Sequence, residues 1–127
     1  MYRCVLTFAA GALLAVSAHA QLAVQRGFPA KALRGTLAVV AAPEVVLNGQ
    51  PARLAPGARV RDTNNLIVQS GALGNTRLVV NYTRDLDGLV REVWVLRPEE
   101  AARPWPTTPQ EAASLLFDPA AQTWSRP

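Results

Sequence analysis

The sequence predicts a mainly β protein: a small antiparallel barrel or sandwich of six or seven short strands, with one short C-terminal helix. Short runs rich in β-branched and other apolar residues recur across residues 34–97. Turn signals separate these runs at close spacing, which is typical of small barrels and sandwiches. The intervals between the runs are too short for crossover helices, so parallel βαβ units are excluded.

The chain begins with a segment that predicts export. One positive charge in Met1-Tyr2-Arg3 precedes an uncharged, apolar run from Cys4 to Ala18, and Ala18-His19-Ala20 offers small residues for signal peptidase. The apolar run of about 15 residues is short of the roughly 20 that a spanning helix needs. We expect residues 1–20 to be a cleaved signal peptide, the protein to be periplasmic or secreted, and no transmembrane segment to remain. A retained N-terminal anchor is the alternative.

Cleavage would also remove two reactive side-chain types from the chain. Cys4 is the only cysteine and His19 the only histidine, so the mature chain would contain neither. Without them, Cys-His and Ser-His-Asp nucleophiles and ordinary zinc, copper or haem sites are excluded. We therefore expect no catalytic residues, no metal site and no cofactor. Without disulfides, stability must come from a packed core.

The first half of the mature chain divides into a lead-in segment and a run of strands. Residues 21–33 have mixed polarity and no clean period, and we treat them as the lead-in segment. The β domain, residues 34–97, opens with a strand over 34–41. Asn48-Gly49 lies between two apolar runs and predicts a hairpin with a type I′ turn, because both central residues of that turn need positive φ. Pro51, which has no N–H for a ladder, places its strand at an edge or a bulge.

The remaining strands follow at short intervals. Residues 77–83 alternate, so Leu78, Val80 and Tyr82 face one way and the polar residues between them face the other. Asp85-Leu86-Asp87-Gly88 predicts a tight loop before the last strand. The expected strands are 58–61, 66–68, 77–83 and 89–96.

Residues 98–127 predict a proline-rich tail with a short helix over 108–117. The tail holds six of the chain's ten prolines. Thr108 can cap the helix, Pro109 suits its first turn, and Glu111 completes a capping box. Asp118-Pro119 should end it.

Arginines fall on or beside the predicted strands, and they are the candidates for an anion-binding face. Such a face would bind a polyanion: a lipid headgroup, a cell-wall polymer or a nucleic acid. A solvated exterior is the alternative, because the formal net charge of +4 is ordinary for a small domain. The candidate residues are Arg59, Arg61, Arg77, Arg84 and Arg91.

Acidic and aromatic residues each allow two interpretations. Asp85, Asp87 and Glu92 could pair as hydrolase carboxylates or bind calcium, but acidic residues also build turns, and the loop lacks acids at the later calcium-ligand positions. The aromatic side chains are expected in the core rather than on a stacking surface for nucleic acid or carbohydrate. Trp105 and Trp124 in the tail either dock it onto the barrel or contact a partner.

The block from Leu33 to Leu96 resembles small exported β-barrel proteins of Gram-negative bacteria. It shares their rhythm: a first strand containing Arg34-Gly35-Thr36-Leu37, a hairpin at Val46–Gly49, and a Pro-Gly turn followed by an alternating strand. The resemblance covers about half of the chain and implies a fold similar to the oligonucleotide/oligosaccharide-binding barrels. It carries no site residues with it.

The function expected from the sequence is a non-enzymatic binding or accessory module of the cell envelope. Its partner would be an envelope protein or a polyanion. Two alternatives stay open: a polyanion binder that uses the arginine face, and a hydrolase built on carboxylates alone.

We predict that the protein recovered from the periplasm or culture medium begins at or near Gln21, because Ala18-His19-Ala20 is the cleavage site. N-terminal sequencing or intact-mass measurement checks this. A mass that retains Cys4 and His19 would refute both the cleavage and the exclusions that follow from it.

Overall fold

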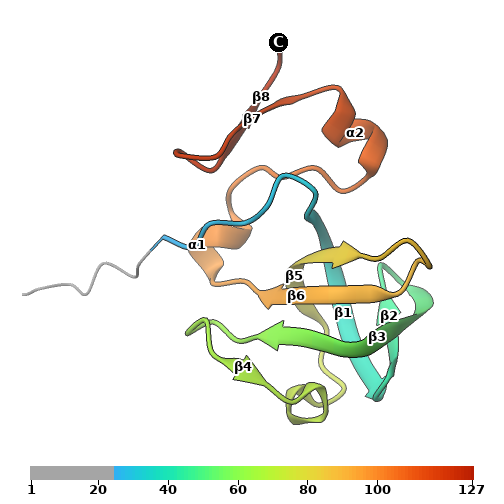
Figure 1. The fold of residues 1–127 in the computed structure, drawn as a ribbon. Coiled ribbons are helices and arrows are strands. Elements are labelled where there is room, and N and C mark those ends of the chain that lie inside the picture. Colours follow the sequence, from blue (N-terminus) through green and yellow to red (C-terminus); the bar gives the residue numbers. More distant parts are fainter. Residues whose placement is uncertain (1–24) are drawn as a thin grey trace, which may run out of the picture.

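The computed structural model describes residues 25–127, so the predicted signal peptide and the first four residues of the lead-in segment lie outside it. Five strands close into a barrel in the order β2-β1-β5-β6-β3, and β3 returns to pair with β2 (Figure 1). The barrel strands are β1 (Leu33–Ala41), β2 (Glu44–Leu47), β3 (Gln50–Arg61), β5 (Leu78–Arg84) and β6 (Val90–Val95). A two-residue strand, β4 (Ile67–Val68), extends the sheet beyond β3.

The barrel confirms the mainly β fold class, with one difference from a purely antiparallel sheet. Four of its pairs are antiparallel, but β3 and β6 run parallel. A closed ring with an odd number of strands cannot alternate direction all the way round, so at least one neighbouring pair must be parallel. The chain makes this pair by passing through β4, a 3₁₀ turn η1 (Ser70–Leu73) and β5 before it adds β6.

Two local features fix the first hairpins. Asn48 and Gly49 have φ values of 54° and 79°, which confirms the predicted turn with positive φ at both positions. The Asn48 side chain then reaches back to β1, where its Oδ1 accepts a hydrogen bond from the Thr36 N–H at 3.0 Å. Gly35 allows this approach, because a Cβ there would lie 2.7 Å from that same oxygen and 3.0 Å from Tyr82 Cε1. The glycine therefore provides room for both neighbours.

Aliphatic side chains fill the barrel interior. The predicted alternation in β5 is confirmed, since Leu78, Val80 and Tyr82 all join the core. Short, branched side chains from every barrel strand meet there, as the small radius of a five-stranded barrel requires. The fully enclosed members include Leu37, Val45, Leu47, Val80, Val90 and Val93.

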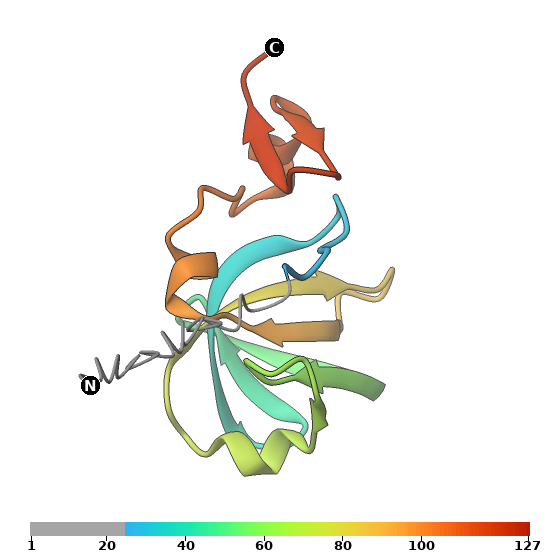
Figure 2. The same cartoon turned by 90° about the vertical axis from the view of Figure 1, so that its left-hand side faces the viewer.

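The tail forms a small module beyond the end of the barrel at which β1 begins (Figures 1 and 2). It contains α1 (Pro98–Ala101), α2 (Pro109–Ala113), β7 (Leu116–Asp118) and β8 (Thr123–Ser125). The helix predicted over 108–117 starts with the expected cap, because Thr108 Oγ1 accepts from the Glu111 N–H at 3.1 Å, but it ends at Ala113. Residues 116–118 pair with β8 instead, which lets Phe117 pack on Trp124. Tertiary packing thus overrides the helical signal.

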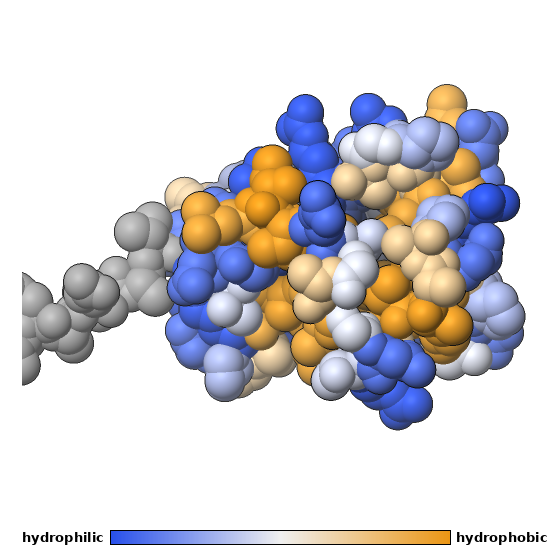
Figure 3. Space-filling model, turned by 90° about the horizontal axis from the view of Figure 1, so that it is seen from below, coloured by the Kyte–Doolittle hydropathy of each residue, from blue (hydrophilic) through white to orange (hydrophobic). Residues whose placement is uncertain are grey.

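The opposite side of the barrel carries scattered apolar side chains. Figure 3, which views the molecule from that side, shows hydrophobic patches separated by polar surface. Leu66, Ile67 and Val40 expose 62%, 61% and 55% of their surface, and none of them lines a pocket described below. Within residues 25–127, no helix is long and apolar enough to cross a membrane.

We predict that Leu37→Ala destabilises the protein by about 2–5 kcal/mol, because it leaves a cavity in a filled core. Leu86→Ala is the matched control: Leu86 is fully exposed in the β5–β6 loop and should change the free energy of unfolding little. Urea unfolding followed by tryptophan fluorescence measures both. Equal effects of the two substitutions would contradict the placement of the core.

Candidate binding site at the junction of barrel and tail

The five candidate anion-binding arginines do not gather in one place on the barrel. Arg77 precedes β5 and Arg84 ends it, so the length of the strand, about 23 Å at 3.3 Å per residue, separates them. Arg59 lies beside Glu92, whose other neighbour is Thr83, so Arg59 belongs to the Arg84 end. Arg91, next to the Val90 that pairs with Arg84, lies at that end too. Arg61 Nη1 donates to the Asn65 carbonyl at 3.4 Å.

The candidate carboxylates belong to local structure and do not converge on a pocket described here. Asp85 Oδ1 accepts hydrogen bonds from the N–H groups of Asp87 and Leu89, at 3.0 and 2.9 Å, and so shapes the β5–β6 loop. Asp87 is exposed, and Glu92 lies on β6 beside Arg59. Among residues 25–127, no group of three or more Asp, Glu, His or Cys side chains is arranged to hold a metal ion.

Both tail tryptophans pack against other aromatic residues of the molecule, Trp105 buried and Trp124 half-buried. Trp105 is 7% exposed, and its indole N–H donates to the Ala32 carbonyl at 2.8 Å. Its ring meets Phe28, Phe117 and Trp124 edge to face, with centroids 5.3 to 5.7 Å apart. The aromatic cluster, defined as Phe28, Trp94, Trp105, Phe117 and Trp124, joins the lead-in segment, β6 and the tail module. The tryptophans therefore dock the tail, the first of the two roles expected from the sequence.

The docked tail buries part of the outer face of the barrel. The register places Arg34, Asn81 and Trp94 in one row across β1, β5 and β6. Arg34 Nε donates to Asn81 Oδ1 at 2.9 Å, and the rest of its guanidinium donates to carbonyl oxygens of Glu100, Ala101 and Arg103. One outward-facing arginine thus ties two barrel strands to the start of the tail.

A second arginine, Arg26 of the lead-in segment, is buried beside it. Arg26 Nε donates to Glu100 Oε2 at 2.9 Å, and Nη2 donates to the other carboxylate oxygen. Nη1 donates to the Asp62 carbonyl at 2.9 Å, and Nη2 also donates to the Val95 carbonyl at 2.8 Å. Arg26 and Glu100 are only 6% and 8% exposed, so the pair forms in a largely dry environment, with four of the five guanidinium N–H groups hydrogen-bonded.

The partners of Glu100 also set its protonation. Burial alone raises the pKa of this carboxyl, but hydrogen bonds from Arg26 and Arg97 and the charges of both outweigh burial, so the pKa lies below its ordinary value. Burial lowers the pKa of Arg34, and the negative charge of Glu100 opposes that change. Glu100 is therefore the anionic centre of a group of buried or half-buried arginines.

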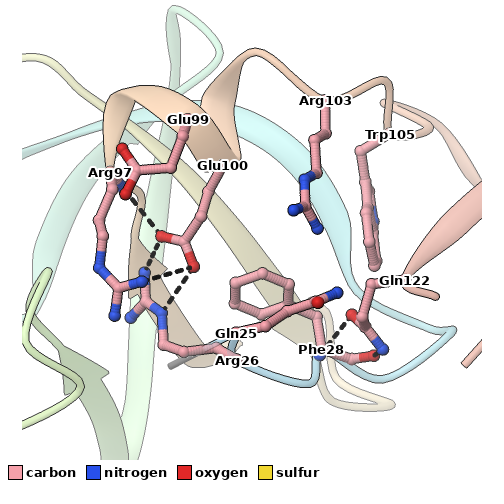
Figure 4. A pocket seen from close by; sticks show the side chains of 9 residues that line it. All are labelled: Gln25, Arg26, Phe28, Arg97, Glu99, Glu100, Arg103, Trp105 and Gln122. Carbon is pink, nitrogen blue, oxygen red and sulfur yellow. Dashed lines mark hydrogen bonds and ion pairs between the residues drawn. The ribbon is translucent and has the colours of Figure 1, made fainter. Parts of the chain in front are cut away.

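A pocket opens where the lead-in segment meets α1 and the rest of the tail module; we call it the junction pocket (Figure 4). It encloses about 70 Å³. Phe28 and Trp105 supply aromatic walls, and the Arg26–Glu100 pair forms one side. The lining residues are Gln25, Arg26, Phe28, Arg97, Glu99, Glu100, Arg103, Trp105 and Gln122.

Arg103 differs from the other two arginines of the junction pocket. Figure 4 shows its guanidinium extending from the end of α1 into the space between Glu100 and Trp105. Within the part of the chain that the structure describes, this guanidinium has no hydrogen bond or ion pair. Gln122, in contrast, is fully used: its amide accepts from the Phe28 N–H at 2.8 Å and donates to the Pro119 carbonyl at 2.9 Å. Arg103 is therefore the cation available to a ligand.

Sequence reasoning missed most of this site. Arg26 and Phe28 lie in a segment without periodicity, and nothing local indicates their partners. Pro98-Glu99-Glu100 does carry a signal, because Pro followed by acidic residues is typical of a helix start. That signal would have found α1, in which Glu100 accepts from the Arg97 N–H at 2.9 Å. It would not have found the bond from Arg26.

A second depression, the apolar groove, lies on the tail module. It is lined mainly by apolar groups of Leu33, Ala112, Leu115, Phe117 and Trp124, with Lys31 at its edge. The Trp124 Nε1 beneath it is buried without a hydrogen-bond partner in the described residues. Among residues 25–127, Lys31 is the one charged residue in the lining of the groove. The junction pocket has Arg103 extending into it, so it is the better defined site.

Breaking the buried pair should cost far more than breaking an exposed one. We predict that Arg26→Ala destabilises the fold by about 3–5 kcal/mol, because it leaves Glu100 buried without its main partner. Arg53→Ala is the control: it breaks the exposed Arg53–Glu44 pair, 3.5 Å apart, and should cost about 0–1 kcal/mol. Denaturant unfolding measures both, and similar losses would contradict a structural role for Arg26.

The same pair should make stability depend on pH in the acid range. Because folding lowers the pKa of Glu100, its contribution is complete above the unfolded value of about 4.3 and is lost as the pH falls through the lower folded value. We predict that Glu100→Gln, less stable at pH 7, loses less stability than the parent chain between about pH 5 and 3. Thermal melts at each pH measure the loss. Melting temperatures that fall equally with pH in the two proteins would contradict this.

Comparison with known proteins gives no relative from which to assign this site. No protein family, curated protein or solved structure matches the chain.

Proposed function

We propose that the protein is a non-enzymatic binding module of the cell envelope that holds an anionic group in the junction pocket. One observation carries the proposal: Arg103 extends into a pocket with aromatic walls and, among the described residues, has no partner there. A guanidinium beside low-dielectric aromatic surface attracts an anion more strongly than one surrounded by water.

The surroundings of Arg103 favour binding because they are fixed before a ligand arrives. Arg26, Glu100 and Arg97 hold one another by hydrogen bonds, and Gln122 is bonded to the backbone of Phe28. The aromatic cluster fixes the rings of Phe28 and Trp105. Three of the nine described lining residues, Gln25, Glu99 and Arg103, are exposed, and the other six are buried or half-buried, so few side chains lose freedom when a ligand binds.

We further propose that the barrel is an OB-like scaffold. The ring order β1-β2-β3-β6-β5, with its Greek-key return, supports this relationship. OB barrels bind their ligands over the second and third strands, often by stacking bases on aromatic rings. Here β2 and β3 contain no aromatic residue, and the aromatic cluster lies at the junction with the tail. The site is therefore proposed at the junction and not on the usual strands.

The two alternatives have weaker support. For a polyanion binder, Arg59, Arg84 and Arg91 lie at one end of the barrel, but Asp85, Asp87 and Glu92 lie among them and reduce the positive potential. For a hydrolase, the same three carboxylates would have to converge on a substrate, whereas the Asp85 carboxylate is occupied by the turn.

In-cell photocrosslinking tests the proposed site. We predict that a benzophenone amino acid at Glu99, on the rim of the junction pocket, captures a defined partner in intact cells, detected by a change in mass. The same probe at Gln50, exposed at the start of β3, should capture little of that partner. Arg103→Gln combined with the Glu99 probe should reduce the capture. Equal capture from both positions, or no effect of Arg103→Gln, would refute the junction pocket as the binding site.

A further inference from the structure

We infer that the anionic group bound in the junction pocket is the terminal carboxylate of a peptide. The inference rests on the proposed function, and it adds the chemical class of the ligand. Three features of the pocket carry it: the planar donors of Arg103 beside two aromatic rings, the acidic residues that share the lining, and the unused amide acceptor of Gln25.

The first feature is the match between Arg103 and a planar anion. A guanidinium presents two parallel N–H groups to a carboxylate, which gives a short, directional contact. The pocket leaves about 70 Å³ for water-sized groups, room for roughly five water molecules at 10–15 Å³ each, which accommodates a carboxylate and the atoms that follow it. The rings of Phe28 and Trp105 lie beside this space and can pack against the carbon atoms that follow the carboxylate.

The second feature selects a single negative charge over a phosphate. Glu99 and Glu100 line the same pocket as Arg103. Arg26 and Arg97 largely compensate the charge of Glu100, but Glu99 is exposed, and no ion pair in the described residues involves it. Among the described residues, the lining carries three arginines and two glutamates, a formal net charge of +1, so a bound monoanion would neutralise it and a dianionic phosphate would leave it negative. The mixed charge therefore favours a monoanion.

The third feature is the Gln25 side chain. Its Nε2 donates to the Ala121 carbonyl at 3.3 Å, whereas its Oε1 accepts no hydrogen bond from any residue in the 25–127 range. A free amide oxygen accepts from N–H groups. The last residue of a peptide carries its N–H on the same Cα as the terminal carboxylate, and Gln25 and Arg103 line the same pocket, so we expect one ligand end to contact both. Capture of a chain end by a few fixed groups is a recurring mode of peptide recognition.

Peptides with matched ends test the inference. The ¹⁵N-labelled chain from Gln21 onward is titrated with N-acetyl-Ala-Ala as the free acid and as its C-terminal amide, each in the L,L and D,D forms. We expect saturable shifts of the Trp105 indole N–H, the Arg103 Nε–H and the Gln25 side-chain amide with a free acid, and at least tenfold weaker binding of its amide. The L and D forms distinguish a protein C-terminus from a stem peptide built of D-residues.

Substitutions assign the effect to Arg103. Arg103→Gln should weaken binding of the free acid at least tenfold, and Arg103→Lys should restore part of it, because the charge returns without the planar pair of donors. Arg126→Gln, another exposed tail arginine, is the matched control and should bind like the parent chain. Arg103 makes no side-chain bond within the described residues, so equal melting temperatures are expected and show that the variants fold.

The outcomes separate the two levels of the proposal. Equal binding of acid and amide, or acid binding unaffected by Arg103→Gln, would overturn the carboxylate inference, while capture by the Glu99 probe would still support the junction pocket. Shifts centred on Arg59, Arg84 and Arg91 would also overturn it, because they would indicate anion binding by the barrel. Failure of the Glu99 probe to capture a partner would refute the proposed function itself.

Discussion

The buried ion pair between Arg26 and Glu100 is the contact on which the arrangement of the two chain ends depends. It joins the lead-in segment to α1, and through the Asp62 and Val95 carbonyls it joins both to the barrel. Desolvating two charges is costly, and four hydrogen bonds from the Arg26 guanidinium offset that cost. A buried pair of this kind adds specificity more than net stability: it permits one docking geometry and penalises others that leave a charge alone.

That geometry has consequences for the aromatic cluster and the pocket. Phe28 follows Arg26 by two residues and Trp105 follows Glu100 by five, so fixing the pair brings their rings to 5.7 Å. The junction pocket lies between these two anchored segments, and neither segment lines it alone. On the proposed function, a ligand that bridged Gln25 and Arg103 would bind only the docked state and would stabilise it by mass action.

The barrel and the junction differ in the side chains they contain. The barrel interior is filled with aliphatic side chains, and their burial stabilises the fold. The lead-in segment and the tail cover one outer face, where Asn81 and Trp94 point away from the core yet are buried. The covered barrel supports the lead-in segment and the tail. The charged, amide and aromatic side chains of the junction pocket gather where these two segments meet.

The sequence by itself determined what depends on neighbours along the chain. It predicted the alternation in β5, the turn at Asn48-Gly49 and the cap at Thr108, since backbone preference and side-chain period decide these locally. It also predicted the mainly β class. Only the tertiary structure decided the closure of the barrel, the end of α2 at Ala113 and the site. Arg26 and Glu100 are 74 positions apart, and no local pattern in either segment records a partner that folding brings from so far away.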